Sequence, residues 1–315
     1  MPFAEFMRLA LYDPVVGYYR SARQRVGYAP GTDFFTASTS GDVFGELVAA
    51  ACTTLLRGHD PRQFTFVEVG AEPGTVAMTG AGGGVLRGVA HPFGTARTVR
   101  VGEPLALAGR CVVFSNELFD AQPFRRFIFR PDGWRELGVA LRDGTLQTVE
   151  LPNPAGHPPV PELPPAAPVG YVIDAPLASV TLLEEITALP WTGLFVACDY
   201  GKSWAELTEA CPEGTARAYH RHIQSNDLLA RPGDQDLTCH LCWDWLAAAL
   251  ARHRFADIQV DSHEAFWVRH AAGFIAQTSV AEATRFSRKK QALLQLLHPA
   301  QLGRKFQVLH AWRGV

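Results

Sequence analysis

Three short apolar runs, each ending in a polar turn, are the strongest constraint that this sequence places on its fold. They cover residues 64–69, 111–114 and 193–198, and the turns that follow contain G-A-E-P-G, N-E-L-F-D and D-Y-G. Apolar runs of this length are typical of strands that are buried on both faces, as in a parallel sheet covered by helices. We therefore predict that the three runs are neighbouring central strands of a doubly wound α/β sheet.

Further elements follow from the spacing of apolar residues along the chain. Helices are predicted at residues 2–12, 43–56, 178–189, 243–252 and 280–297, and strands at residues 256–260 and 305–312. Residues 123–151 read as a three-strand antiparallel meander with hairpin turns at Asp132-Gly133 and Asp143-Gly144. We expect this excursion to pack against the sheet domain without joining its main sheet.

Eight prolines between residues 152 and 168 indicate an extended loop after the meander. The chain is therefore predicted to have four parts. They are an N-terminal helical and loop segment (1–57), a first part of the α/β core (58–122), the antiparallel excursion with its proline-rich loop (123–170), and a second part of the core with a helical substrate-side insertion (171–315).

Composition narrows the class of protein and of partner. A net charge of −2 over 315 residues gives no electrostatic reason to bind nucleic acid or an anionic membrane. The longest apolar runs are far shorter than a membrane span, and the N-terminus lacks a secretory pattern. Cys52, Cys111 and Cys198 lie in apolar surroundings and read as reduced core thiols. We expect a cytoplasmic protein with a protein substrate or partner; the sequence leaves the oligomeric state open, a homodimer included.

The three strand ends carry groups that can serve a ligand, although each also has a structural interpretation. The G-x-x-x-G at residues 70–74 could be only a tight turn, and residues 116–117 could cap a helix. The D-Y-G at residues 199–201 could be a cap and a turn. Together, and in this order, they favour a ligand site at the carboxyl ends of parallel strands.

The order of these motifs resembles the MidA-like methyltransferases, the family of the mitochondrial complex I assembly arginine methyltransferase. The similar segments span nearly the whole chain: P-F-A-E-F-M-R-L-A-L-Y-D-P-V-V-G-Y-Y, G-T-D-F-F-T-A-S-T-S-G-D-V-F-G-E-L, V-F-S-N-E-L-F-D-A-Q-P-F, D-Y-G, R-A-Y-H-R-H, R-P-G-D-Q-D-L-T-C-H and L-G-R-K-F-Q-V-L. The resemblance implies a class I methyltransferase (Rossmann-like) fold that binds S-adenosylmethionine at its first, second and fourth strand ends.

The resemblance also implies roles for single residues. The cofactor-binding candidates are Asp33, Glu68, Gly70, Gly74, Glu103 and Asn116. Glycine suits a cofactor loop because, lacking a Cβ, it allows close approach of the backbone. Glu117 and Asp120 are the catalytic candidates, since a guanidinium nucleophile needs carboxylates to orient it. The implied function is methylation of arginine in a protein.

The cofactor loop departs from the family pattern. Glu72 stands where the family has its central glycine, so that a carboxylate would face the cofactor's own carboxylate. Pro73 beside it lacks an amide donor, and the A-G-G-G at residues 81–84 weakens the helix that should follow.

The stretch between the glycine loop and Asn116 has room for one strand, at residues 99–110, where the family has two. As the second strand it would supply Glu103 as the ribose acid and leave the third strand missing. As the third strand, which its spacing to Asn116 favours, it would leave no ribose acid. Either arrangement predicts weak or absent S-adenosylmethionine binding. The alternative function is a catalytically inactive protein of the same fold that acts as a binding or assembly factor.

A second constellation has the ligand types of a zinc site. Its members are His220, His222, Cys239, His240 and Cys242. We favour a structural interpretation and predict no metal there, because Cys239 falls where the family has variable small residues and Cys242 precedes a helix. The resemblance instead suggests that His220 or His222, and His240, line a substrate cleft or cap loops.

Overall fold

The chain divides into two compact units. The computed structural model describes residues 1–21, 25–27, 32–33, 37–71, 84–152, 163–284, 287–298, 303 and 306–314. One unit, which we call the meander unit, consists of residues 1–23, 119–182 and 201–246; the other, the sheet unit, consists of residues 24–118, 183–200 and 247–315. Helices α3 (Leu177–Ala188) and α5 (Trp243–Arg252) have residues in both units.

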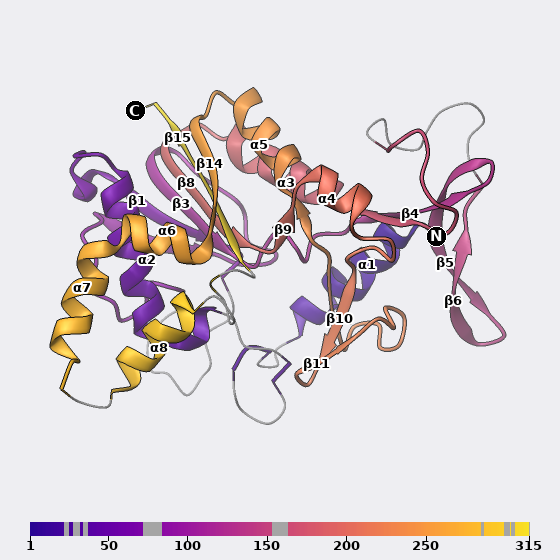
Figure 1. The fold of residues 1–315 in the computed structure, drawn as a ribbon, viewed down its shortest axis with the longest axis horizontal. Coiled ribbons are helices and arrows are strands. Elements are labelled where there is room, and N and C mark those ends of the chain that lie inside the picture. The colour runs from indigo at the N-terminus through magenta and orange to yellow at the C-terminus, as the bar shows by residue number, and fades with distance from the viewer. Residues whose placement is uncertain are drawn as a thin grey trace. The chain divides into compact units, whose positions relative to one another are not determined.

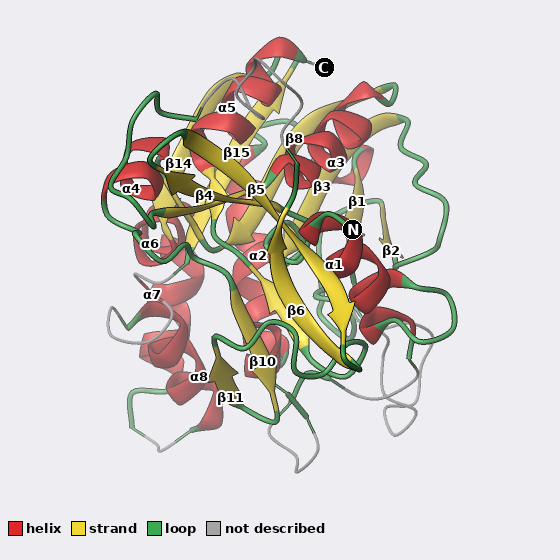
Figure 2. Cartoon of the chain, turned by 90° about the vertical axis from the view of Figure 1, so that its right-hand side faces the viewer, coloured by secondary structure: helices red, strands yellow, loops and turns green. Residues whose placement is uncertain are grey.

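The sheet unit is built on a six-stranded sheet in the order β14-β15-β8-β3-β1-β2 (Figure 1 and Figure 2). The pairs β2–β1, β1–β3 and β3–β8 are parallel, whereas β15 is antiparallel to both of its neighbours. Its elements are the short 3-10 helices η2 (Ala37–Ser40) and η3 (Pro61–Gln63), helices α2 (Asp42–Leu55), α6 (His263–His270), α7 (Ala272–Ala281) and α8 (Arg288–Leu297), and strands β1 (Thr65–Val69), β2 (Thr95–Val99), β3 (Gly109–Asn116), β8 (Trp191–Asp199), β14 (Ala256–Ser262) and β15 (Gln307–Arg313).

The three predicted central strands are neighbours in this sheet, which confirms the fold class expected from the sequence. Successive side chains of a strand point to opposite faces, so an apolar run serves both. Phe66, Phe114 and Val196 lie in one buried core with residues of α2, α6 and α8. On the opposite face Phe195 meets Phe255, just past α5, with ring centroids 6.5 Å apart. Residues of the sheet are thus covered on both sides.

The strand predicted at residues 99–110 lies instead at Thr95–Val99 (β2), and residues 100–108 are not in a strand. Strand β2 lies parallel to β1, which is the place of the second strand in a 3-2-1-4-5-6 order, so the spacing argument for a third strand was wrong. Most of β2 is exposed, and an exposed edge strand needs no apolar run. The segment after it turns at Gly102, whose φ is +84°. Among the residues that the structure describes, the six-stranded sheet ends at β2.

The predicted helix at residues 280–297 is also corrected. The structure has α7, ending at Ala281, and α8, beginning at Arg288, in its place. The Ser287 hydroxyl accepts a hydrogen bond from the Lys290 amide, which is an N-cap interaction that starts a new helix. The other four predicted helices lie within a residue or two of their predicted positions, whereas α4 (Trp204–Glu209) and α6 were not predicted.

The meander unit contains the antiparallel strands β4 (Arg125–Arg130), β5 (Gly133–Arg142) and β6 (Thr145–Glu150), as predicted. Asp143 and Gly144 have φ values of +50° and +75°, as the hairpin turn requires, and Figure 2 shows β5 and β6 as a long ribbon. A fourth strand that the sequence did not suggest, β7 (Val172–Ala175), pairs with β4.

The remaining elements of the meander unit are short. They are α1 (Phe3–Tyr12), the 3-10 helix η1 (Tyr18–Arg20), α4 (Trp204–Glu209), and strands β9 (Gly201–Lys202), β10 (Arg217–His220), β11 (Ile223–Ser225), β12 (Asp236–Thr238) and β13 (Leu241–Cys242). The N-terminus is tied to the meander, since the Met1 ammonium donates to the Val139 carbonyl at 2.9 Å and the Val139 amide donates to the Met1 carbonyl at 2.8 Å.

Candidate functional site

The carboxyl ends of β1, β3 and β8 meet at one edge of the sheet unit. The register pairs Glu68 with Phe114 and Asn116 with Cys198. Gly70, two residues past Glu68, is therefore level with Asn116. In open parallel sheets ligands bind outside this edge, so Glu68, Gly70 and Asn116 are brought together where a cofactor is expected.

Glu68 is buried, and its carboxyl serves the chain itself. Oε2 accepts a hydrogen bond from the Val85 amide at 2.5 Å. A Cβ added to Gly84 would lie 3.1 Å from the same oxygen, so the chain at residues 84–85 passes close to it. Burial raises the pKa of Glu68 to about 7, although the hydrogen bond from Val85 works in the opposite direction.

Gly70 has a conformational and a packing reason to be glycine. Its φ is +84°, which side chains rarely adopt, and a Cβ there would lie 2.7 Å from Cδ1 of Leu118. Its amide donates to the Val99 carbonyl at 2.8 Å, which fixes the end of β1 to the end of β2. The fold alone therefore requires this glycine.

Asn116 and Glu117 form the end of β3. The Asn116 amide nitrogen Nδ2 donates to Glu117 Oε1 at 3.0 Å, and the Glu117 backbone amide donates to the Cys198 carbonyl at 2.9 Å. Within the described part of the chain, the Asn116 Oδ1 is buried and has no hydrogen-bond partner. Glu117 has a φ of +50°, which is uncommon for a residue other than glycine and is concentrated at functional sites.

Glu103 and Asp33 lie elsewhere in the sheet unit. Glu103, four residues past β2, is exposed, and its carboxylate accepts from the Arg100 amide at 2.8 Å, which closes its own turn. Asp33 is fully buried, and its backbone amide donates to the Arg25 carbonyl at 2.7 Å. The predicted cofactor residue Gly74, like Glu72 and Pro73, falls outside the described residues.

Asp120 belongs to the meander unit, where it is buried, and its carbonyl accepts from the Cys239 amide at 3.0 Å. The same unit contains a half-buried tyrosine, Tyr19, that the sequence did not single out. The Tyr19 hydroxyl donates to Asp236 Oδ1 at 2.8 Å. The Tyr12 ring stacks on the Tyr19 ring, with the two centroids 5.5 Å apart. Burial, with Asp236 and Asp120 nearby, raises the pKa of Tyr19 well above its usual value.

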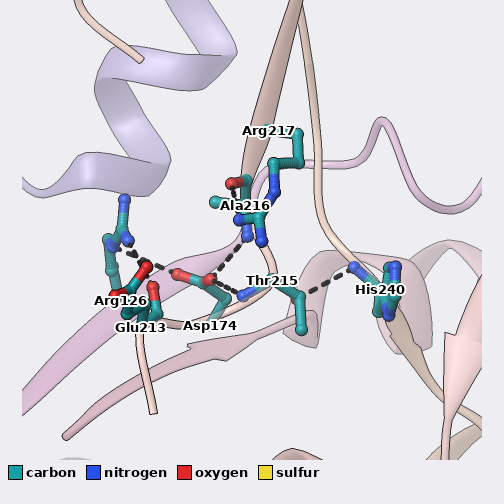
Figure 3. A network of polar contacts seen from close by, with 7 residues as sticks. All are labelled: Arg126, Asp174, Glu213, Thr215, Ala216, Arg217 and His240. Carbon is teal, nitrogen blue, oxygen red and sulfur yellow. Dashed lines mark hydrogen bonds and ion pairs between the residues drawn. The ribbon is translucent and has the colours of Figure 1, made fainter. Parts of the chain in front are cut away.

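Sequence reasoning also missed a polar network around Asp174 (Figure 3). The Asp174 carboxylate lies 3.2 Å from Arg126 Nε and accepts from the Thr215 and Ala216 amides at 2.7 and 2.8 Å. The Arg126 contact lacks the alignment of a hydrogen bond and is therefore mainly a charge interaction. Arg126 and residues 215–216 are far from Asp174 in the sequence, and no sequence motif predicts these contacts.

His240 joins this network through its backbone, since its amide donates to the Thr215 hydroxyl at 3.1 Å (Figure 3). Burial, with the charges of Lys202 and Arg217, lowers the pKa of His240 to about 4, so the imidazole is neutral near pH 7. The network orders the backbone before β10 and β13 in the meander unit.

The mostly parallel sheet and its strand order match a Rossmann-like methyltransferase fold. Residues 98–259 match the family described as "Putative S-adenosyl-L-methionine-dependent methyltransferase". The chain belongs to this family.

Two solved structures are similar over the whole chain. A COG1565 superfamily member and "likely methyl transferase" from Burkholderia thailandensis, bound to S-adenosyl-homocysteine, is 24% identical with a TM-score of 0.85. A native structure of an uncharacterized COG1565 superfamily protein from the same organism is 22% identical with a TM-score of 0.78. In both cases the similarity covers 100% of this chain and 88% of the other. No curated protein matches the sequence. Within the described residues, no helix is long and apolar enough to cross a membrane.

The described residues fit S-adenosylmethionine in part. The cofactor presents hydrogen-bond donors, namely an ammonium, two ribose hydroxyls and the adenine amine. The buried Asn116 Oδ1 is an acceptor of the right kind at the expected edge. One oxygen of Glu68 and one of Glu103 already accept hydrogen bonds from the chain's own backbone.

Proposed function

We propose that this protein is an S-adenosylmethionine-dependent protein arginine methyltransferase with reduced affinity for its cofactor. The observation that carries the proposal is the Asn116 Oδ1, a buried acceptor without a partner among the described residues, at the carboxyl edge of a methyltransferase sheet. Leaving a buried acceptor unsatisfied costs about 1–3 kcal/mol, so such an atom favours a donor from a ligand.

On this proposal, Asn116 would accept a hydrogen bond from the cofactor, and the turn at Gly70 would let the cofactor approach the backbone. Glu103 would have to leave its turn at Arg100 to reach a ribose hydroxyl. Asp33 and Gly74 are cofactor-binding positions by resemblance alone. When bound, the cofactor supplies an electrophilic methyl group on a sulfonium.

The substrate class rests on the acidic residues after β3. Asn116 holds the Glu117 carboxylate through the 3.0 Å hydrogen bond, and the Cys198 carbonyl holds the Glu117 backbone. An oriented carboxylate is suited to pair with a guanidinium in a bidentate manner. Asp120 follows three residues later in the sequence and is the second catalytic candidate by resemblance alone.

The proposed reduction in cofactor affinity follows from the hydrogen bonds that two acidic side chains accept from the protein's own backbone. Each hydrogen bond that Glu68 or Glu103 accepts from a backbone amide competes with a hydrogen bond from the cofactor. Losing one charged hydrogen bond costs roughly 1.5–3 kcal/mol, or about one to two decades in affinity. Glu72, by its charge, would add to this loss.

The same two hydrogen bonds favour one alternative, a catalytically inactive protein of this fold that acts as a binding or assembly factor. A methylation assay separates the two functions. The protein is incubated with millimolar S-adenosylmethionine and a library of arginine-containing peptides, and methylated peptides are identified by mass spectrometry. We expect arginine methylation by the wild type, a loss of about 100-fold or more in Glu117→Gln, and no change in the exposed control Glu185→Gln. Cofactor binding without methylation of any peptide or added protein would support the inactive alternative.

A further inference from the structure

A second group of polar side chains lies in the sheet unit, away from the strand ends described above. It consists of Asp261 on β14, His270 at the end of α6 and His310 on β15. One oxygen or nitrogen atom from each residue lies within 4.8 Å of the corresponding atom of the other two. Among the described residues this is the group with metal-ligand spacing, and it contains none of the histidines and cysteines considered in the sequence.

The contacts of the three side chains are specific. His310 Nε2 lies 3.2 Å from Asp261 Oδ2, and His310 is 5% exposed. The His270 and His310 rings have centroids 5.3 Å apart, and both pack on Phe266, at 5.0 and 5.3 Å. In the described part of the chain, His270 Nε2 is buried and lacks a hydrogen-bond partner.

We propose that Asp261, His270 and His310 bind a divalent transition-metal ion, with zinc as the best match. Two imidazoles and one carboxylate are a common ligand set for zinc, and a water molecule completes four-coordination. Tetrahedral coordination at about 2.1 Å places ligand atoms roughly 3.4 Å apart. The Asp261–His310 distance of 3.2 Å already meets this requirement, and a small movement of the half-buried His270 would close the third side.

The surroundings of the two histidines suit the proposed site. His310 is buried and His270 is half-buried, and both rings pack on Phe266, which restricts their orientation. His270 is the last residue of α6, and the partial negative charge at a helix C-terminus favours a cation.

Two arginines limit the affinity of the site. Arg269 Nη1 donates to both oxygens of Asp261, at 2.8 and 3.0 Å. Arg57 pairs with Asp257 at 2.6 Å, and its positive charge also interacts electrostatically with His310. If the metal takes Oδ2, Arg269 can keep Oδ1 and orient the ligand, as outer-shell partners of metal sites do. Their charges repel a cation, so we expect micromolar rather than picomolar binding.

The proposed ion would connect three elements at one edge of the sheet. β14 is the outermost strand there, β15 is its neighbour, and α6 follows β14 directly. A ligand that binds only the folded state stabilises it by mass action, so zinc should raise the melting temperature. This inference does not depend on the proposed methyltransferase function.

Calorimetry with zinc alone, on the full chain freed of metal, tests the site. We expect one zinc to bind per chain and to raise the melting temperature by about 5 °C at 100-fold excess over the dissociation constant. His270→Ala and Asp261→Asn should lose at least tenfold in affinity and most of the shift. The control His253→Ala changes a histidine of the same unit outside the group and should bind like the wild type.

Cobalt separates this site from the free cysteines. Bound Co²⁺ should give visible d–d absorption without the sulfur-to-cobalt charge-transfer bands that thiolate ligands produce. Charge-transfer bands, equal zinc binding by the wild type and His270→Ala, or no binding by the wild type would each overturn the proposal. Near-wild-type circular dichroism of His270→Ala excludes unfolding as the cause of a loss.

Discussion

Glu68 has a buried carboxyl group that accepts one hydrogen bond from the backbone. Its raised pKa, about 7 against a usual value near 4.5, makes folding depend on pH. Between these values the folded state keeps a proton that the unfolded state has lost. The contribution of Glu68 to stability is therefore present below pH 4.5 and falls as the pH rises towards 7.

We predict that Glu68→Gln removes this dependence, because a glutamine can accept the Val85 hydrogen bond without a charge. Relative to wild type, the variant should gain up to about 3 kcal/mol of stability between pH 4.5 and pH 8. Melting temperatures measured across this range check the prediction. Glu185→Gln, at an exposed position, is the control, and a wild type that gains stability over Glu68→Gln with rising pH would contradict it.

Much of the strand-end edge could be predicted at the level of residues, but not its hydrogen bonds. Glu68, Gly70 and Asn116 follow strands that are apolar on both faces, so their common edge is written into the sequence. The Val85 bond to Glu68 and the turn around Glu103 join backbone to side chain within loops. Such hydrogen bonds have no sequence motif, and only the structure shows that these two acids accept hydrogen bonds from the backbone.

At the scale of elements, burial separates the strands that the sequence predicts from a strand that it misplaces. β1, β3 and β8 are buried and therefore apolar, whereas β2 is an exposed edge and carries Thr-Ala-Arg-Thr. The hairpin turns at residues 132–133 and 143–144 were visible because Asp-Gly suits their backbone geometry. β7 was missed because its Asp174 interrupts an apolar run, and the partners of Asp174 come from β4 and from residues 215–216.

Asp174 carries a prediction for the meander unit. Replacing it with alanine removes the partner of the half-buried Arg126 and two acceptors for backbone amides (Figure 3). Breaking a buried pair in this way costs about 3–5 kcal/mol. Denaturant unfolding should therefore show a loss of this size for Asp174→Ala.

The matched control is Glu150→Ala, which removes the Glu150–Arg130 pair between β6 and β4. Both of its side chains are more than a third exposed, so the loss should stay below about 1 kcal/mol. Equal effects of the two substitutions would show that the buried network around Asp174 adds nothing to stability.

At the scale of the whole molecule, family membership and fold point to S-adenosylmethionine, and our proposal of reduced affinity rests on the hydrogen bonds that Glu68 and Glu103 accept from the backbone. Asn116 is the residue on which the proposed cofactor site can be tested, because its Oδ1 is a buried acceptor without a hydrogen-bond partner among the described residues. Removing it should cost about one hydrogen bond, or roughly tenfold in affinity.

Isothermal titration of the purified protein with S-adenosylhomocysteine, the product form of the cofactor, tests this account most directly. We expect a dissociation constant of about 100 µM to 1 mM, a further tenfold weakening in Asn116→Ala, and no change in the exposed control Asn226→Ala. A dissociation constant near 1 µM would contradict the reduced affinity. No binding at millimolar ligand, or equal binding by wild type and Asn116→Ala, would contradict the proposed cofactor site itself.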